Sequence, residues 1–133
     1  MDVLLASRQQ DDRRDLEVIL RGSPWKLIAA GGRAEAEGIL QQLDVPIVLC
    51  DRDLSGEPWQ NTVRALVASR SGACVILVSN VTDQYLWDEV VKRGGFDVLT
   101  RPFESQAVLS MLNFAHTHCQ TSWPMAPRGR VGT

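Results

Sequence analysis

Residues 46–56 read PIVLCDRDLSG, and this stretch decides the fold. Its apolar run, Ile47 to Cys50, is rich in β-branched side chains and is too short for a helix. Such a run is typical of a strand buried on both faces of a parallel sheet. Asp51 and Asp53 follow directly, and open α/β sheets place their binding sites beyond the carboxyl ends of strands. Asp51 is therefore predicted at a functional edge, although an acidic turn without a function has the same local pattern.

The rest of the chain alternates between short apolar runs and amphipathic segments. Strands are predicted at residues 3–6, 25–30, 46–50, 73–79 and 96–100. Helices are predicted around residues 16–20, at 33–43, at 59–70, from an N-cap at Thr82 to a stop at Gly94, and from a cap at Ser105 to about residue 120. In the fourth helix, the spacing predicts a buried stripe of Leu86, Trp87, Val90 and Val91.

Five strands that alternate with five helices require right-handed crossovers and a parallel sheet covered on both faces. We therefore predict an α/β fold with a doubly wound, five-stranded parallel sheet in the flavodoxin-like order 2-1-3-4-5. The predicted domain covers residues 1–120. Residues 121–133 contain prolines and glycines without periodicity, so a flexible tail or linker is predicted there.

The composition is that of an ordinary globular domain, with 133 residues, 44% hydrophobic residues and a net charge of −2. This charge argues against direct contact with nucleic acid, and no apolar run is long enough for a membrane helix. The start of the chain has no basic region, so no signal peptide is expected. Cys50, Cys74 and Cys119 have no metal-ligand spacing and are interpreted as apolar residues of a cytoplasmic protein in a reducing compartment.

Four features at the predicted strand ends resemble the receiver domain of two-component response regulators, over about residues 2–120. They are Asp51 after the third strand, Leu54 and Gly56 in the following loop, Ser79 at the end of the fourth strand, and Arg101-Pro102-Phe103 after the fifth. The family has its phosphoacceptor aspartate at the first of these positions, a Ser or Thr at the position of Ser79, and a Lys-Pro pair at the last.

The resemblance implies a signalling module of the phosphorelay type that is not an enzyme. Asp51 is the implied phosphoacceptor, and Ser79 and Arg101 are the implied phosphoryl contacts. The implied partner is a histidine kinase or a phosphotransfer protein, and a homodimer through the fourth helix, fifth strand and fifth helix is a further implication. Val98 stands where the family has an aromatic switch residue. In the family this aromatic side chain turns inward, and the short, stiff side chain of valine cannot make that movement. A docking module that works without phosphorylation is therefore an equal expectation.

The largest departure from the family concerns the metal. Receivers carry two carboxylates after the first strand that help to hold Mg²⁺, whereas this chain has Ser7 and Arg8. Asp51 and Asp53 remain as metal ligands, and the added cation is expected to weaken Mg²⁺ binding. We hypothesise that Arg8 and Arg101 both pair with Asp51 in place of the metal; the alternative is that Arg8 points into solvent.

Other residues and other functions were weighed against this interpretation. Asp11 and Asp12 fall within the first helix and are expected on its solvated surface. The Asp51–Asp53 pair also resembles the first motif of haloacid-dehalogenase-like phosphatases, with Asp51 as nucleophile and Asp53 as general acid. Against that enzyme, the motif normally follows the first strand. A flavin binder of the same fold is disfavoured because Ser7-Arg8-Gln9-Gln10 is not a phosphate loop rich in Ser, Thr and Gly.

Overall fold

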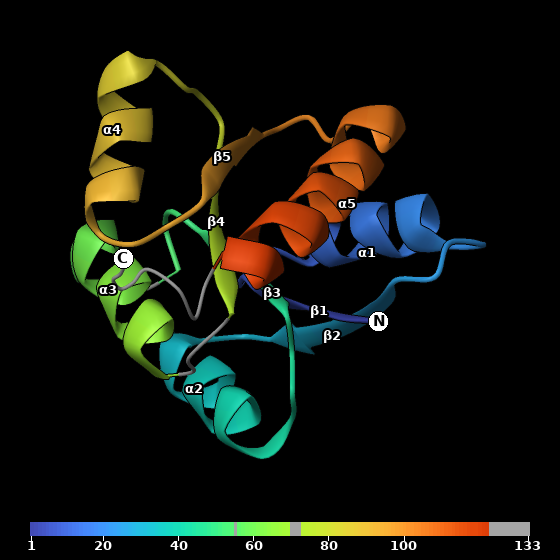
Figure 1. The fold of residues 1–133 in the computed structure, drawn as a ribbon, viewed down its shortest axis with the longest axis horizontal. Helices are drawn as coiled ribbons and strands as arrows, with labels where there is room; N and C mark the ends of the chain where they lie inside the picture. Colours follow the sequence, from blue (N-terminus) through green and yellow to red (C-terminus); the bar gives the residue numbers. More distant parts are fainter. Residues whose placement is uncertain (55, 70–72, 123–133) are drawn as a thin grey trace.

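The computed structural model describes residues 1–54, 56–69 and 73–122, and it confirms the predicted fold (Figure 1). The strands are β1 (Asp2–Ala6), β2 (Lys26–Ala30), β3 (Ile47–Asp51), β4 (Cys74–Ser79) and β5 (Asp97–Thr100). The helices are α1 (Gln10–Leu20), α2 (Arg33–Gln42), α3 (Trp59–Ser69), α4 (Gln84–Lys92) and α5 (Ser105–Ser122). All neighbouring strands pair in parallel, in the order β2-β1-β3-β4-β5.

Two separate hydrophobic clusters hold the helices on the two faces of the sheet. Successive residues of a strand point to opposite faces, so the apolar runs of β3 and β4 supply both clusters. The cluster that includes Val48 and Leu77 packs against α2, α3 and α4. The cluster that includes Leu49 and Ile76 packs against α1 and α5. The continuous apolar character of the two strands is thus explained by burial on both sides.

The strand register brings polar residues from different parts of the chain to one edge of the sheet. Ala6, the last residue of β1, pairs with Cys50, so Ser7, which follows β1, lies next to Asp51 at the end of β3. Asp51 pairs with Val78, and Ser79 pairs with Thr100. Asp51, Ser79 and Arg101 therefore follow the same edge in succession, which is the edge at which doubly wound sheets carry their sites.

Helix α4 differs from its prediction at its cap and in its buried stripe. The N-cap is Asp83 and not Thr82, because the Asp83 carboxylate accepts a hydrogen bond from the backbone N–H of Leu86 at 2.8 Å. Leu86 and Val90 are buried as predicted, whereas Trp87 and Val91 are 40% and 41% exposed. Trp87 and Val91 each follow a buried residue by one position, so they point to a different side of the helix and form a separate apolar strip on the surface.

Substituting Asp83 by alanine should lower the free energy of unfolding by about 1 kcal/mol, because it removes the side-chain acceptor for an otherwise unpaired first-turn N–H group. Thr82→Ala is the matched control and should change the stability by less than about 0.5 kcal/mol. Urea unfolding followed by circular dichroism measures both values. An equal loss in the two variants would contradict the assignment of the cap to Asp83.

The ends of the last two helices follow from local hydrogen bonding. Gly94 has φ +91° after α4, the left-handed conformation predicted for the stop of this helix. At the start of α5, Glu104 replaces the predicted cap Ser105, since its carboxylate accepts hydrogen bonds from the N–H groups of Gln106 and Ala107. Helix α5 extends through Ser122, two residues into the predicted tail, and residues 123–133 lie outside the described residues.

The sequence suggested that all three cysteines are small apolar residues with free thiols, but the structure differs for two of them. Cys74 of β4 and Cys119 of α5 form a disulfide, so the interpretation of three free thiols is wrong for this pair. The pair therefore gives no support to a reducing compartment. Cys50 is a buried free thiol, and burial, with a smaller contribution from the charge of Asp51, raises its pKa to about 12. Within the described residues, no helix has the length and apolar character needed to cross a membrane.

Candidate functional site

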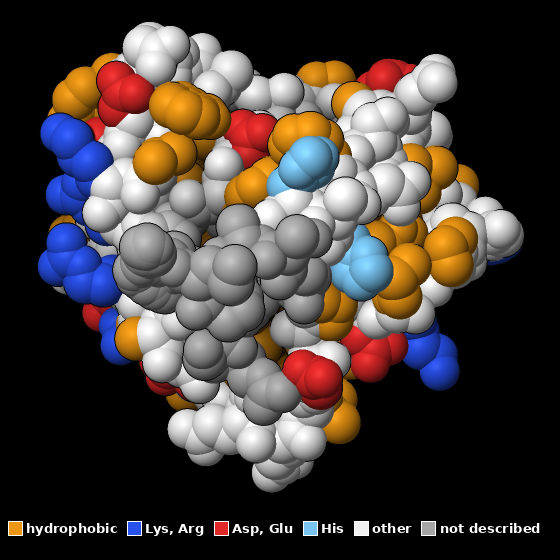
Figure 2. All heavy atoms as spheres, viewed as in Figure 1, with side chains coloured by type: hydrophobic (Ala, Val, Ile, Leu, Met, Phe, Trp, Pro, Cys, Tyr) orange, Lys and Arg blue, Asp and Glu red, His pale blue; other side chains and the backbone are white. Residues whose placement is uncertain are grey.

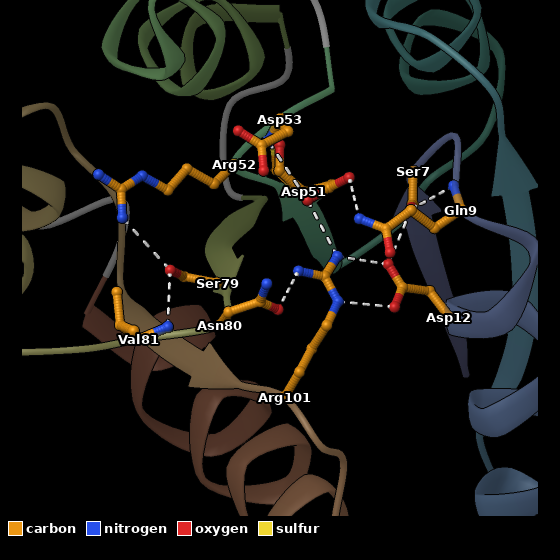
Figure 3. Close-up of polar contacts among 11 residues, drawn as sticks. Ser7, Gln9, Asp12, Asp51, Arg52, Asp53, Ser79, Asn80, Val81 and Arg101 are labelled. Carbon is orange, nitrogen blue, oxygen red and sulfur yellow. Dashed lines mark hydrogen bonds and ion pairs between the residues drawn. The ribbon is translucent and has the colours of Figure 1, made fainter.

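Asp51 lies at the centre of a polar cluster at the carboxyl edge of the sheet (Figure 3). Its side chain is buried, and both of its carboxylate oxygens accept hydrogen bonds. Oδ1 accepts from Arg101 Nη2 at 2.9 Å and from the backbone N–H of Asp53 at 3.3 Å. Oδ2 accepts from Gln9 Nε2 at 3.3 Å. The predicted pairing of Arg101 with Asp51 is confirmed.

The guanidinium of Arg101 links two carboxylates. Its Nε donates to Asp12 Oδ1 at 2.8 Å, and its Nη2 contacts Asp12 Oδ2 at 2.5 Å as well as Asp51 Oδ1 at 2.9 Å. Nη1 donates to Asn80 Oδ1 at 3.3 Å. The two hydrogen bonds to Asp12 chiefly, and then the one to Asp51, raise the pKa of Arg101 above its ordinary value, although burial opposes the shift. The side chain is thus held as a permanent cation between two acids.

Asp12 is the member of this polar cluster that the sequence interpretation missed. It was expected on the solvated surface of the first helix, but only 3% of it is exposed. Besides the two bonds from Arg101, its Oδ2 accepts a hydrogen bond from Ser7 Oγ at 2.8 Å. Helical periodicity would have found it, because Asp12 precedes Leu16 and Leu20 at i+4 and i+8 and so shares the stripe that faces the sheet. Its neighbour Asp11 is exposed, as expected.

Arg8 does not take the place that was predicted for it. The residue is exposed and takes part in none of the ion pairs among the described residues. The hypothesis that it pairs with Asp51 is therefore wrong, and the solvent-facing alternative holds. The two residues that flank Arg8 contact the cluster instead: Ser7 donates a hydrogen bond to Asp12, and Gln9 donates one to Asp51.

Ser79 is buried beside this cluster, but its hydroxyl faces another arginine. Ser79 Oγ accepts hydrogen bonds from Arg52 Nη1 at 3.5 Å and from the backbone N–H of Val81 at 3.3 Å. Figure 3 shows Arg52 on the side of Ser79 that is remote from Arg101. The site therefore has a guanidinium group on each of two sides, and within the described residues only that of Arg101 contacts a carboxylate.

The residues at this edge do not fit a bound Mg²⁺ ion. A cation that bridged Asp12 and Asp51 would need the oxygens that Arg101 Nη2 contacts at 2.5 and 2.9 Å. Asp53 is exposed, and its backbone N–H is what bonds to Asp51. The described part of the chain contains no group of three acidic, histidine or cysteine side chains arranged to hold a metal ion. The guanidinium thus provides the positive charge that a hard cation would otherwise supply.

No family model and no curated protein matches the sequence, but its fold has many relatives among solved structures. A two-component response regulator from Clostridium difficile is similar with a TM-score of 0.79 at 13% identity, over 89% of this chain and 97% of that one. A response regulator from Thermotoga maritima gives 0.80 at 21% identity, over 87% and 97%. The beryllofluoride-activated NtrC4 receiver domain dimer gives 0.79 at 19% identity, over 89% and 98%. The chain therefore has the fold of a response regulator receiver domain.

Proposed function

We propose that this chain is a signalling module of a phosphorelay that docks to a histidine kinase or phosphotransfer protein and does not depend on phosphorylation of Asp51. The observation that carries this proposal is the position of Arg101 Nη2, which lies within hydrogen-bond distance of both Asp12 and Asp51. The receiver fold and the position of Asp51 at the end of β3 support the signalling class. The bonds of Asp51 support the independence from phosphorylation.

Phosphoryl transfer to Asp51 would require one of its oxygens to attack phosphorus while a cation neutralises the transferred oxygens. Both oxygens of Asp51 are already hydrogen-bonded, and only 1% of the residue is exposed. Arg101 cannot move to the phosphoryl group without leaving Asp12, to which it donates two hydrogen bonds. Leaving a buried carboxylate unpaired costs several kcal/mol. Asp51 is thus a poor acceptor, and it serves as a structural anchor for Arg101.

The proposed docking surface is the face formed by α4, β5 and α5. Trp87 and Val91 of α4 are exposed, and so is Phe114 of α5, at 55%. Figure 2 shows hydrophobic side chains at the surface over both helices. Exposed aromatic side chains are frequent at the centres of protein interfaces. A second copy of this chain is a proposed occupant as well, since the similar NtrC4 receiver domain was determined as a dimer.

A small phosphodonor tests the proposal directly. Wild type and Asp51→Asn are incubated with acetyl phosphate, with and without Mg²⁺, and their intact masses are measured. We expect less than about a tenth of the wild type to gain one phosphoryl group, because Arg101 is held by Asp12 and is not free to neutralise the transferred phosphoryl oxygens. Stoichiometric gain in wild type and no gain in Asp51→Asn would overturn the proposal and make Asp51 a working acceptor.

The same samples test the enzyme alternative. A haloacid-dehalogenase-like phosphatase that used Asp51 and Asp53 would release phosphate from p-nitrophenyl phosphate when Mg²⁺ is added. We expect no release above that of Asp51→Asn, because the Asp51 carboxylate is bonded to Arg101. Turnover that the substitution abolishes would favour the phosphatase over the docking module.

A further inference from the structure

A pocket of about 210 Å³ lies around Arg52, whose guanidinium Figure 3 shows on the side of Ser79 remote from Arg101. It is bounded by the end of β3, the start of α3 and the loop from β4 into α4, and its lining includes Arg52, Trp59, Val81, Tyr85 and Leu86. A pocket of this size, below the roughly 300 Å³ at which sites for drug-sized ligands begin, suits a small molecule.

Arg52 brings a positive charge into this cavity without an acidic partner. The residue is half-buried, and none of the ion pairs within the described residues includes it. Its backbone N–H donates to Val78 O at 2.9 Å, which fixes the position from which the side chain extends. Among the residues that the structure describes, only Nη1 has a side-chain partner, Ser79 Oγ at 3.5 Å. A guanidinium has five N–H donors, so the remaining ones are available to an oxyanion.

The other walls favour a ligand with a ring or another apolar body. Trp59 packs against the core on one side, and Leu86 is buried at the start of α4. Tyr85 is 70% exposed at the margin and offers an aromatic face that can cover a ligand. Asp83 also lines the cavity, but it is exposed, so solvent screens its charge, and its Oδ1 is used by the Leu86 N–H. The half-buried charge of Arg52 therefore dominates locally.

We propose that this cavity binds a small organic carboxylate, with the carboxylate on Arg52 and the apolar body beside Trp59 and Tyr85. An Arg–carboxylate contact is frequently bidentate, and it remains compatible with the Nη1 bond to Ser79 because the guanidinium has a second edge. The ligand would thus lie beside the Arg52 guanidinium that donates to Ser79 Oγ, at the margin of the Asp51 cluster. This site does not depend on phosphoryl transfer, so its test stands apart from that of the proposed function.

Sodium benzoate is the probe, and two-dimensional ¹H–¹⁵N NMR of the whole chain is the measurement. We expect saturable shifts of the Trp59 indole N–H and of the backbone N–H groups of Val81 and Thr82, which line the pocket. Benzyl alcohol, which has the same ring without the charge, should leave these signals in place at equal concentration. Arg52→Gln should weaken benzoate binding at least about tenfold, since it removes the charge-assisted hydrogen bonds to the carboxylate.

Arg64→Gln is the matched control, because Arg64 is an exposed arginine of α3 that does not line the cavity. It should bind benzoate as wild type does. The same spectra report whether each variant is folded, and Arg52→Lys, which keeps the charge but loses the fork, replaces Arg52→Gln if that variant unfolds; it too should bind more weakly. Absent shifts in wild type, equal shifts with benzyl alcohol, or undiminished binding after loss of Arg52 would overturn the proposal.

Discussion

Replacing Arg101 by methionine should lower the free energy of unfolding by about 3–5 kcal/mol, the largest effect of any single substitution at this site. Methionine keeps much of the side-chain volume but removes the guanidinium. Asp12 and Asp51, which are 3% and 1% exposed, would then be buried without their ion-pair partner. Removing one member of a buried ionic group is costly because the charges that remain have lost both solvent and partner. Urea unfolding of wild type and variant, in buffer that contains a chelator, measures the difference.

Two further variants separate this explanation from a general loss of packing. Asp12→Asn combined with Arg101→Met removes one of the unpaired charges, so it should recover part of the lost stability. Arg8→Met changes an exposed arginine next to the site and should alter stability by less than about 0.5 kcal/mol. A loss below about 1 kcal/mol in Arg101→Met would contradict the view that the guanidinium neutralises a buried pair of acids.

The same substitution should make the site bind Mg²⁺. Two unit charges about 4 Å apart interact by roughly 4 kcal/mol at an effective dielectric constant near 20, which corresponds to about a thousandfold in affinity. The wild-type site contains that repulsion, because Arg101 Nη2 contacts the oxygens of both Asp12 and Asp51. We expect Arg101→Met to bind Mg²⁺ about a hundred- to a thousandfold more tightly than wild type does. Isothermal titration calorimetry with MgCl₂ measures both affinities.

Arg8→Met is again the informative control. The sequence alone had suggested that Arg8, like Arg101, takes the place of the metal ion. The structure predicts that this variant binds Mg²⁺ as weakly as wild type does, because the Arg8 side chain is exposed. Tight binding to wild type, at micromolar Mg²⁺, would refute the conclusion that the residues do not fit the ion. A gain in Mg²⁺ affinity in Arg8→Met would show that Arg8 also opposes metal binding.

The fold was predictable because hydrophobic periodicity records which faces of each element are buried. The runs in β3 and β4 are apolar on both faces, so they could only be central strands. Helix α4 shows the limit of this reasoning. Leu86 and Trp87 are equally apolar, yet only Leu86 reaches the core, because adjacent positions on a helix are 100° apart and packing selects one of them. Thr82 and Asp83 are likewise both good caps, and only the backbone geometry chooses between them.

The candidate site was predictable where it depends on strand ends and not where it depends on a helix. Asp51, Ser79 and Arg101 follow strands, and the parallel register alone brings them to one edge. Asp12 reaches the same edge from the first turn of α1. It was overlooked because the family's acidic residues were expected immediately after the first strand. The direction of Arg8 could not be derived, because a long side chain in a surface loop has many rotamers of similar energy.

The positive charge of Arg101 is part of the polypeptide, so it cannot dissociate from the site as a bound metal ion can. A bound ion equilibrates with its free pool, so the occupancy of a conventional metal site rises and falls with supply and is lost to chelators. A guanidinium hydrogen-bonded to Asp12 and Asp51 has a fixed stoichiometry of one. Changes in divalent ion concentration are therefore expected to leave this centre in the same state.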